Sequence, residues 1–145
     1  MTNNAKSKLA HLKDVRLLTF KRFDDERGML VPVESGIDVP IQIERFFYVT
    51  PNQAGQSRGK HGHFHCTQIL IALAGHVTVK VQDNVAIDTY ELTEPNQALM
   101  IPPSLWAEEI YNSSDSLLLV LCDHKFDADD YINCFDDFLA FRGMK

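Results

Sequence analysis

The sequence predicts an all-β protein, a sandwich or barrel of short strands with a short helix near the C-terminus. Two observations support this prediction. Short stretches with strand-like apolar patterns recur along the chain, and clusters of turn-forming residues separate them. Helical spacing of apolar residues is found only near the end of the chain. The length of 145 residues fits one domain, residues 1–145, with a sizeable core.

The clearest strand covers residues 76–82, where Val77, Val79 and Val81 alternate with polar residues. This alternation is typical of a strand with one buried face. The other expected strands are Asp14–Phe20, Gly28–Val33, Ile43–Thr50, Gln68–Leu73, Ala86–Leu92, Ala98–Ile101 and Leu117–Cys122. Turn-forming residues lie at 24–28, 51–53, 82–84 and 93–96.

The predicted helix lies in the stretch DADDYINCFDDFLAF, residues 127–141. Its aromatic residues Tyr131, Phe135 and Phe138 recur at helical spacing, and acidic residues stand at its start. Asp127 or Asp129 could cap this helix, since acidic residues are favourable at a helix N-terminus. We expect the aromatic side chains to pack the helix on the barrel.

Charge and cysteine content exclude several classes of partner and location. The net charge of −6 argues against nucleic acid, although a small phosphorylated ligand needs only one or two well-placed arginines. Cys66, Cys122 and Cys134 form no CxxC pair, which is typical of a reduced cytoplasmic protein. The N-terminus lacks the apolar segment of a secretory signal, and no apolar run is long enough to span a membrane.

The stretch RGKHGHFHCTQ, Arg58–Gln68, places His61, His63 and His65 at alternate positions. On a strand, all three imidazoles would project from one face. Such a cluster could bind a metal or catalyse proton transfer, or its members could have no common role. The residues alone leave these alternatives open.

The spacing around the histidines narrows the choice. Gly55, His61, His63, Gln68 and Gly75 form the pattern Gly-x5-His-x-His-x4-Gln-x6-Gly. This pattern resembles the first motif of the cupin superfamily, Gly-x5-His-x-His-x3–4-Glu-x6-Gly. The resemblance implies an RmlC-like cupin fold, a double-stranded β-helix or jelly-roll barrel.

Two departures from this motif bear on metal binding. Gln68 stands where metal-binding cupins have a glutamate, and Ala107 stands at the position of the last histidine ligand, in the turn IPPSLWAEEIYN. An amide is a poorer ligand than a carboxylate for a hard cation, and alanine offers no ligand atom. His65 would lie about 7 Å from His63 along a strand, and we expect it to have a supporting role. The sequence therefore predicts no functional metal.

Without a metal, His61 and His63 suit proton transfer, because an imidazole has an unperturbed pKa of about 6.5 and can both accept and return protons near neutral pH. Rings at positions i and i+2 of one strand are neighbours, so they could act on adjacent carbons of a substrate. The alternative is that both are polar side chains satisfied in the mouth of a barrel. We favour the catalytic interpretation for this pair.

Five segments, in order, carry a closer resemblance: DERGMLVPVE (25–34), RFFYV (45–49), RGKHGHFHCTQILIALAG (58–75), IPPSLW (101–106) and DADDYINCFDDF (127–138). With them the chain resembles the metal-free sugar 3,4-ketoisomerases of the cupin superfamily, which act on dTDP-4-keto-6-deoxy-D-glucose. Gly62 and Phe64 depart from the alanine and the basic residue that are common in this family.

The resemblance implies an isomerase that moves the ketone from C4 to C3 through an enediol, without metal or other cofactor. It assigns His63 as the base at C3 and His61 as the group that acts at C4 or polarises its oxygen, although the order stays open. Tyr48 is a candidate to hydrogen-bond the sugar or to relay a proton.

Substrate binding is expected to depend on arginines, because a guanidinium matches the geometry of phosphate. Arg58 is the first candidate for the diphosphate, and Arg45 and Arg27 are weaker ones. Gln68 is expected to hydrogen-bond a histidine or the sugar, and Trp106 to line the pocket. The resemblance further implies a homodimer with exchanged N-terminal strands, and a downstream aminotransferase that makes a 3-amino sugar.

Three other functions compete with this one. A 3,5-epimerase acts on the same nucleotide sugar, but it usually pairs one histidine with a tyrosine and has a longer chain. A non-enzymatic cupin would bind a small molecule, and a dioxygenase-type cupin would require a metal. The paired histidines and the short length favour the ketoisomerase.

Overall fold

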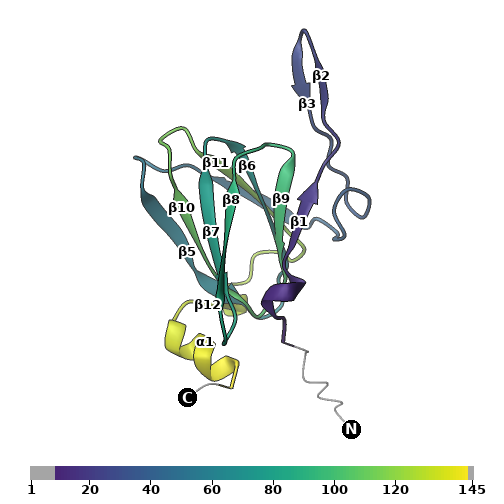
Figure 1. The fold of residues 1–145 in the computed structure, drawn as a ribbon. Coiled ribbons are helices and arrows are strands. Elements are labelled where there is room, and N and C mark those ends of the chain that lie inside the picture. Colours follow the sequence, from purple (N-terminus) through teal and green to yellow (C-terminus); the bar gives the residue numbers. More distant parts are fainter. Residues whose placement is uncertain (1–8, 144–145) are drawn as a thin grey trace.

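Two five-stranded antiparallel sheets face each other in the computed structural model, which describes residues 9–143 (Figure 1). The first sheet has the order β1 (Arg16–Thr19), β9 (Gln97–Ile101), β6 (Gln68–Ala74), β11 (Leu117–Cys122) and β4 (Arg45–Val49). The second has the order β12 (Tyr131–Ile132), β5 (Gln56–His63), β10 (Trp106–Tyr111), β7 (Val77–Gln82) and β8 (Ile87–Leu92). The predicted all-β architecture is confirmed.

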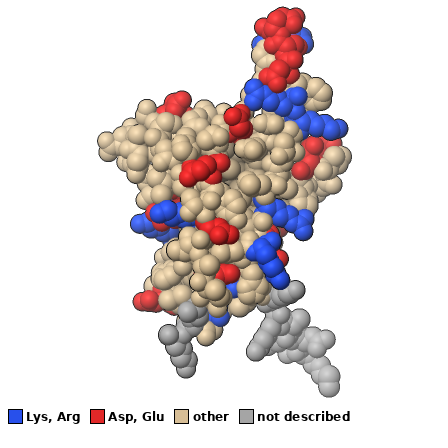
Figure 2. Space-filling view, viewed as in Figure 1, with Lys and Arg blue, Asp and Glu red and all other residues tan. Residues whose placement is uncertain are grey.

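A small hairpin, two short 3-10 helices and one α-helix complete the described part of the chain. The hairpin of β2 (Phe23–Asp25) and β3 (Gly28–Leu30) projects away from the two sheets (Figure 1). Acidic residues crowd its tip, whereas much of the sandwich surface in the same view is uncharged (Figure 2). The helices are η1 (Leu12–Asp14), η2 (Ala128–Asp130) and α1 (Phe135–Phe141). No helix within residues 9–143 is long and apolar enough to cross a membrane.

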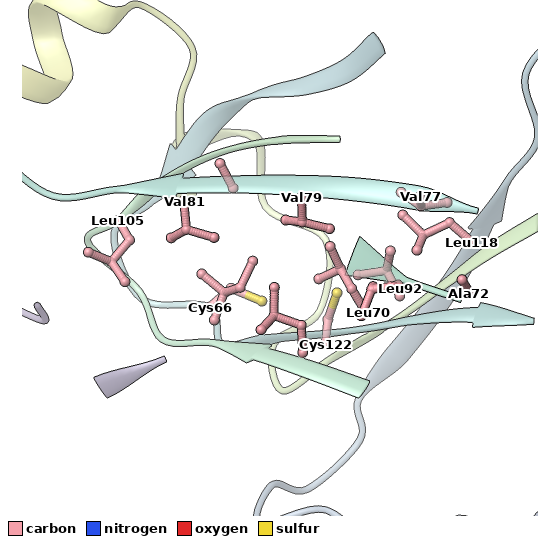
Figure 3. Packing of buried hydrophobic residues seen from close by; sticks show 14 of the residues in the cluster. Cys66, Leu70, Ala72, Val77, Val79, Val81, Leu92, Leu105, Leu118 and Cys122 are labelled. Atoms are coloured by element: carbon pink, nitrogen blue, oxygen red, sulfur yellow. The ribbon is translucent and has the colours of Figure 1, made fainter. Parts of the chain in front are cut away.

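The core lies between the sheets. Val77, Val79 and Val81 are fully buried, which confirms the alternation expected for residues 76–82. Their side chains meet apolar residues of the opposite sheet, among them Leu70 and Leu118 (Figure 3). Burial of a side chain of this size contributes about 1.5–3 kcal/mol, so this contact between sheets dominates the stability of the sandwich.

All of the expected strands form, although the ends of several differ by up to three residues. The main difference is β10, because residues 101–112 were expected to be a turn and Trp106–Tyr111 instead forms a central strand between β5 and β7. A second difference is β2, a strand that was not expected and that ends inside the stretch 24–28 expected to be a turn. The histidine stretch does form a strand, β5, which ends at His63.

The predicted C-terminal helix is partly wrong. Asp127 caps the short turn η2, with its carboxylate accepting the backbone N–H of Asp129 at 2.9 Å. Tyr131 follows in β12 and pairs with His63 of β5, and the α-helix starts only at Phe135. Pairing with a strand edge satisfies backbone groups that a helix would otherwise satisfy internally, and this tertiary pairing overrides the helical spacing.

A β-bulge interrupts β5 next to its histidines. In the register with β10, His61 lies opposite Ala107 and Arg58 lies opposite Glu109, so β5 carries one extra residue at this point. Gly59 in the bulge has φ +73°, a left-handed conformation that favours glycine. Residues opposite each other share a face of the sheet, so the bulge turns Arg58 toward the same side as Glu109.

Candidate active site

His61 and His63 lie side by side at the end of β5. Their ring centroids are 5.0 Å apart and the rings are nearly perpendicular, at 84°. His63 is buried and His61 is half-buried. The pair therefore forms one unit, with the neighbouring rings expected from the alternation of a strand.

Asp130 fixes the orientation of His63. Its carboxylate lies 2.9 Å from His63 Nδ1 and also accepts the backbone N–H groups of His65 at 2.7 Å and Cys66 at 3.3 Å. An ionised carboxylate can only accept hydrogen bonds, so the proton of the neutral imidazole is on Nδ1. His63 Nε2 is then an unprotonated nitrogen, buried and without a hydrogen-bond partner among the described residues.

Tyr131 packs against both imidazoles. Its ring centroid is 4.4 Å from that of His63 and 5.1 Å from that of His61. Its hydroxyl accepts a hydrogen bond of 3.1 Å from Arg45, whose Nε donates to the carbonyl of His124 at 3.1 Å. Arg45, predicted to bind substrate, thus lies close to the histidines, where its guanidinium holds Tyr131.

Burial shifts the pKa values of both histidines downward. Desolvation, with a smaller contribution from the neighbouring His63, lowers the pKa of His61 to about 4. Desolvation also lowers the pKa of His63, although the hydrogen bond and the charge of Asp130 oppose this shift. Both imidazoles are therefore neutral near pH 7, which suits them to accept protons.

A cavity of about 100 Å³ opens between the sheets beside His61. Its apolar lining consists of Phe47, Val49, Leu118 and Val120. Its polar lining consists of Arg58, Gly59, His61, Gln68, Glu109 and Tyr111. An apolar cavity with a few convergent polar groups is typical of a small-molecule site.

Arg58 connects this cavity with a second one. The second cavity, of about 250 Å³, is lined by the loop residues 50–52 and by Gln56, Ser57, Arg58 and Tyr111. The guanidinium of Arg58 makes no ion pair or hydrogen bond with another described residue. Its place at the junction follows from the bulge, which turns Arg58 to the inner side of β5.

The structure thus brings several predicted site residues together: His61, Gln68 and Arg58 line one cavity, and His63 lies beside it. Gln68 is buried as expected for a pocket residue, but its amide donates to Cys122 Sγ at 3.8 Å and hydrogen-bonds neither histidine. His65 is exposed, two residues beyond the end of β5.

Other predicted residues lie elsewhere. Tyr48 alternates with the inward-facing residues of β4 and is 68% exposed on the outer face of the sheet, away from the cavity. Arg27 lies on the projecting hairpin, where it pairs with Asp25 at 2.6 Å. Trp106 packs on the helix residues Phe135 and Phe138, with ring centroids 5.3 and 5.5 Å apart, so it supports α1 and does not line the cavity.

Sequence reasoning missed Asp130, Tyr131 and Glu109. The first two lie in the acidic, aromatic C-terminal stretch, where a helix was expected to use Tyr131 for packing. Glu109 lies in a stretch expected to be a turn. If β10 had been recognised as a strand, its alternation would have placed Glu109 on the buried face. An acidic residue is unusual on such a face, so Glu109 would have been a candidate site residue.

Metal-ligand residue types converge at two places within residues 9–143: His63, Cys66 and Asp130, and Cys66, Asp123 and His124. Neither group unites His61 with His63. In the cupin arrangement the ligands beside these histidines would come from the positions of Gln68 and Ala107, and an amide and a methyl group occupy them. The donor set at the cavity therefore does not fit the usual cupin metal site.

A protein-family model described as FdtA, WxcM-like, C-terminal, matches residues 13–143. The chain is 32% identical over 123 residues to TDP-4-oxo-6-deoxy-alpha-D-glucose-3,4-oxoisomerase of Aneurinibacillus thermoaerophilus, across 85% of this chain and 88% of the relative. A mutant of the 3,4-ketoisomerase QdtA of Thermoanaerobacterium thermosaccharolyticum, in complex with TDP-4-keto-6-deoxyglucose, matches with a TM-score of 0.86 and 33% identity, across 89% and 94% of the two chains. The TDP-quinovose 3,4-ketoisomerase WlaRB of Campylobacter jejuni matches with a TM-score of 0.83 and 30% identity, across 89% and 99%.

The fold itself is more widely shared. A dTDP-4-dehydrorhamnose 3,5-epimerase of Bacillus anthracis matches with a TM-score of 0.72 at 16% identity, across 81% of this chain and 77% of the epimerase. At this identity the likeness concerns the fold alone. The RmlC-like cupin fold predicted from the histidine motif is thereby confirmed.

Proposed function

Because this chain belongs to the WxcM-like FdtA family, we propose that it is a TDP-sugar 3,4-ketoisomerase that moves the ketone of dTDP-4-keto-6-deoxy-D-glucose from C4 to C3. The observation that carries the proposal is the His63–Asp130 pair, which leaves His63 Nε2 unprotonated beside His61 and next to a cavity. The relatives named for this reaction align over most of this chain.

The reaction needs one base and a way to return a proton. The carbonyl at C4 acidifies the hydrogen on C3, and His63 Nε2 removes it as a proton. The electron pair forms the C3–C4 double bond of an enediol. A proton is then added to C4 and the ketone re-forms at C3. C3 is oxidised as C4 is reduced, so the isomerisation consumes no external oxidant or reductant. Asp130 stabilises the imidazolium that His63 becomes.

Arg58 is proposed to bind the diphosphate. It lies between the cavity beside His61 and the larger cavity next to the loop at 50–52. A sugar beside the histidines would place its phosphates toward this arginine, whose guanidinium has no other partner among the described residues. The protein carries a net charge of −6, so this local cation must oppose the overall field.

The test is NMR spectroscopy of the product formed from the thymidine-linked 4-keto sugar. We expect a product with its ketone at C3 and a new hydrogen at C4. In heavy water, the position of the deuterium label distinguishes isomerisation from epimerisation. A 3,5-epimerase would label C3 and C5 and leave the ketone at C4. His63→Asn should abolish isomerisation, whereas His65→Asn, the control at the exposed histidine nearby, should retain it. A ketone that stays at C4 with the wild-type protein would refute the proposed function.

We further propose that the protein forms a homodimer. The projecting hairpin exposes Phe23, Met29 and Leu30, and isolated hairpins of this size are marginally stable alone. The outer face of the first sheet exposes Leu17 and Phe46 as well. A second copy that covers these surfaces would bury both at once. Light scattering tests this, and a monomer at micromolar concentration would refute it.

The cytoplasm is the proposed location of the reaction. Cys66 and Cys122 are buried free thiols, and Cys134 is an exposed free thiol. Free thiols are stable in a reducing compartment. A nucleotide sugar as substrate agrees with this location.

A further inference from the structure

Glu109 is a buried acid that the mechanism above does not use. It lies in the middle of β10 and is only 7% exposed. Its side chain makes no hydrogen bond or ion pair with another residue of the range 9–143. Buried carboxylates are normally paired, so an unpaired one that lines a cavity requires a reason.

The fold places this carboxyl group next to the proposed chemistry. Glu109 lies opposite Arg58 in the register of β10 and β5, and its carboxylate lies directly over Gly59, where a methyl group would overlap it. Glu109, His61 and Gln68 line the same cavity. The bulge at Gly59 therefore opens the space that the carboxyl group occupies, between Arg58 and His61.

Burial in this cavity shifts the pKa of Glu109 and the pKa of His61 in opposite directions. Desolvation raises the pKa of Glu109 to about 7; its own backbone N–H opposes the shift and the nearby Glu108 adds to it. Desolvation lowers the pKa of His61 to about 4. Between these two pH values, Glu109 carries a proton that the neighbouring imidazole has lost.

An enediol mechanism needs such a proton. When His63 removes the hydrogen from C3, negative charge develops on the ketone oxygen at C4, and a neutral imidazole is a weak acid toward it. Arg58 is committed to the diphosphate in the proposed binding mode. A neutral carboxylic acid in the cavity can stabilise this oxygen without adding charge beside an anionic substrate.

We propose that Glu109, in its protonated form, is a catalytic residue that exchanges a proton with the sugar oxygens at C4 and C3. This inference rests on the proposed ketoisomerase function. As His63 takes the proton from C3, Glu109 gives its proton to the C4 oxygen, and the enediol forms. As C4 receives its hydrogen from the imidazolium, the C3 hydroxyl returns its proton to the Glu109 carboxylate and the ketone forms at C3. Both groups regain their initial protonation.

Glu109→Gln tests this role, because glutamine keeps the shape and a hydrogen-bond donor but has no dissociable proton. We expect kcat to fall by roughly 100-fold or more, the range of general acid–base catalysis, with little change in KM. In the wild type, kcat should decline as pH rises through about 7, where Glu109 ionises, and the residual activity of the variant should lack this decline. Glu108→Gln is the matched control, since this neighbour faces Lys60 at 3.8 Å on the other side of the strand and should retain wild-type kcat.

Carbon-13 NMR of labelled glutamate in the free wild-type protein gives a second measurement that does not depend on a variant. One carboxyl resonance, assigned by its absence from Glu109→Gln or by selective labelling, should titrate near pH 7. The inference is overturned if that resonance titrates with an ordinary glutamate pKa. It is also overturned if Glu109→Gln keeps wild-type kcat, keeps the alkaline decline or changes KM alone. If wild-type protein fails to move the ketone, the proposed function fails first, and the titration then reports a buried acid without this role.

Discussion

Replacement of Glu109 by glutamine should change how the stability of the protein depends on pH. The pKa of this carboxyl group is 4.5 in an exposed chain and about 7 in the folded protein. Between these pH values the folded state holds a proton that the unfolded state has released. Stability therefore falls as pH rises through this window, and the whole cost is present above pH 7. A difference of roughly 2.5 pKa units corresponds to about 3 kcal/mol, a large part of the stability of a domain of this size.

Urea unfolding at pH 4.5 and pH 8 measures this cost. The free energy of unfolding of Glu109→Gln, relative to the wild type, should increase by about 3 kcal/mol between the two pH values, because the amide does not titrate. Any cost of burying the amide itself is the same at both pH values and cancels. Glu108→Gln should stay close to the wild-type curve, since desolvation is the main cause of the raised pKa of Glu109 and the charge of Glu108 is a minor one. Parallel pH curves for Glu109→Gln and wild type would refute the claim that burial holds a proton on Glu109.

The remaining predictions concern the geometry of the site. Asp130→Asn should lower kcat by roughly 100-fold or more with the fold retained, because the amide no longer fixes the proton on His63 Nδ1; full activity in the NMR assay would contradict this role. Arg58→Ala should raise KM by roughly tenfold or more through loss of a charge-assisted hydrogen bond, and an unchanged KM would contradict its proposed contact with the diphosphate. Gly59→Ala should lower the free energy of unfolding by at least roughly 1–3 kcal/mol, because φ at this residue is +73° and the added methyl group would displace the Glu109 carboxyl group; an unchanged urea midpoint would contradict both causes.

Sequence patterns predicted the sandwich because the sheet-forming signal is local. The alternation of Val77, Val79 and Val81 reports directly which face of β7 is buried. The spacing of His61 and His63 likewise needs only the geometry of one strand, and the rings meet as expected at 5.0 Å. Features of this kind are predictable because residues two apart on a strand share a face in any fold.

The partners of the histidines were not predictable in this way, because they come from distant parts of the chain. Asp130 lies 67 residues after His63, and only the pairing of β12 with β5 brings it to the imidazole. The helical spacing of Tyr131 with Phe135 and Phe138 favoured one helix. Tyr131 instead joins the edge of a sheet, while the two phenylalanines pack on Trp106 as a helix was expected to do.

The bulge in β5 and the acid in β10 explain why the rest of the site escaped detection. A bulge reverses the alternation of a strand, so no periodic pattern could assign Arg58 to the same side as Glu109. Within β10, Ala107, Glu109 and Tyr111 are buried, so a charged residue occupies the middle of an otherwise apolar inner face. A sequence selected for stability alone would place an apolar residue there, since the unpaired acid costs about 3 kcal/mol at neutral pH. Glu109 lies in the wall of the cavity that also contains His61, whose pKa is low. A destabilising residue is expected at such a place when the reaction needs a proton donor, because the neutral histidines do not supply one.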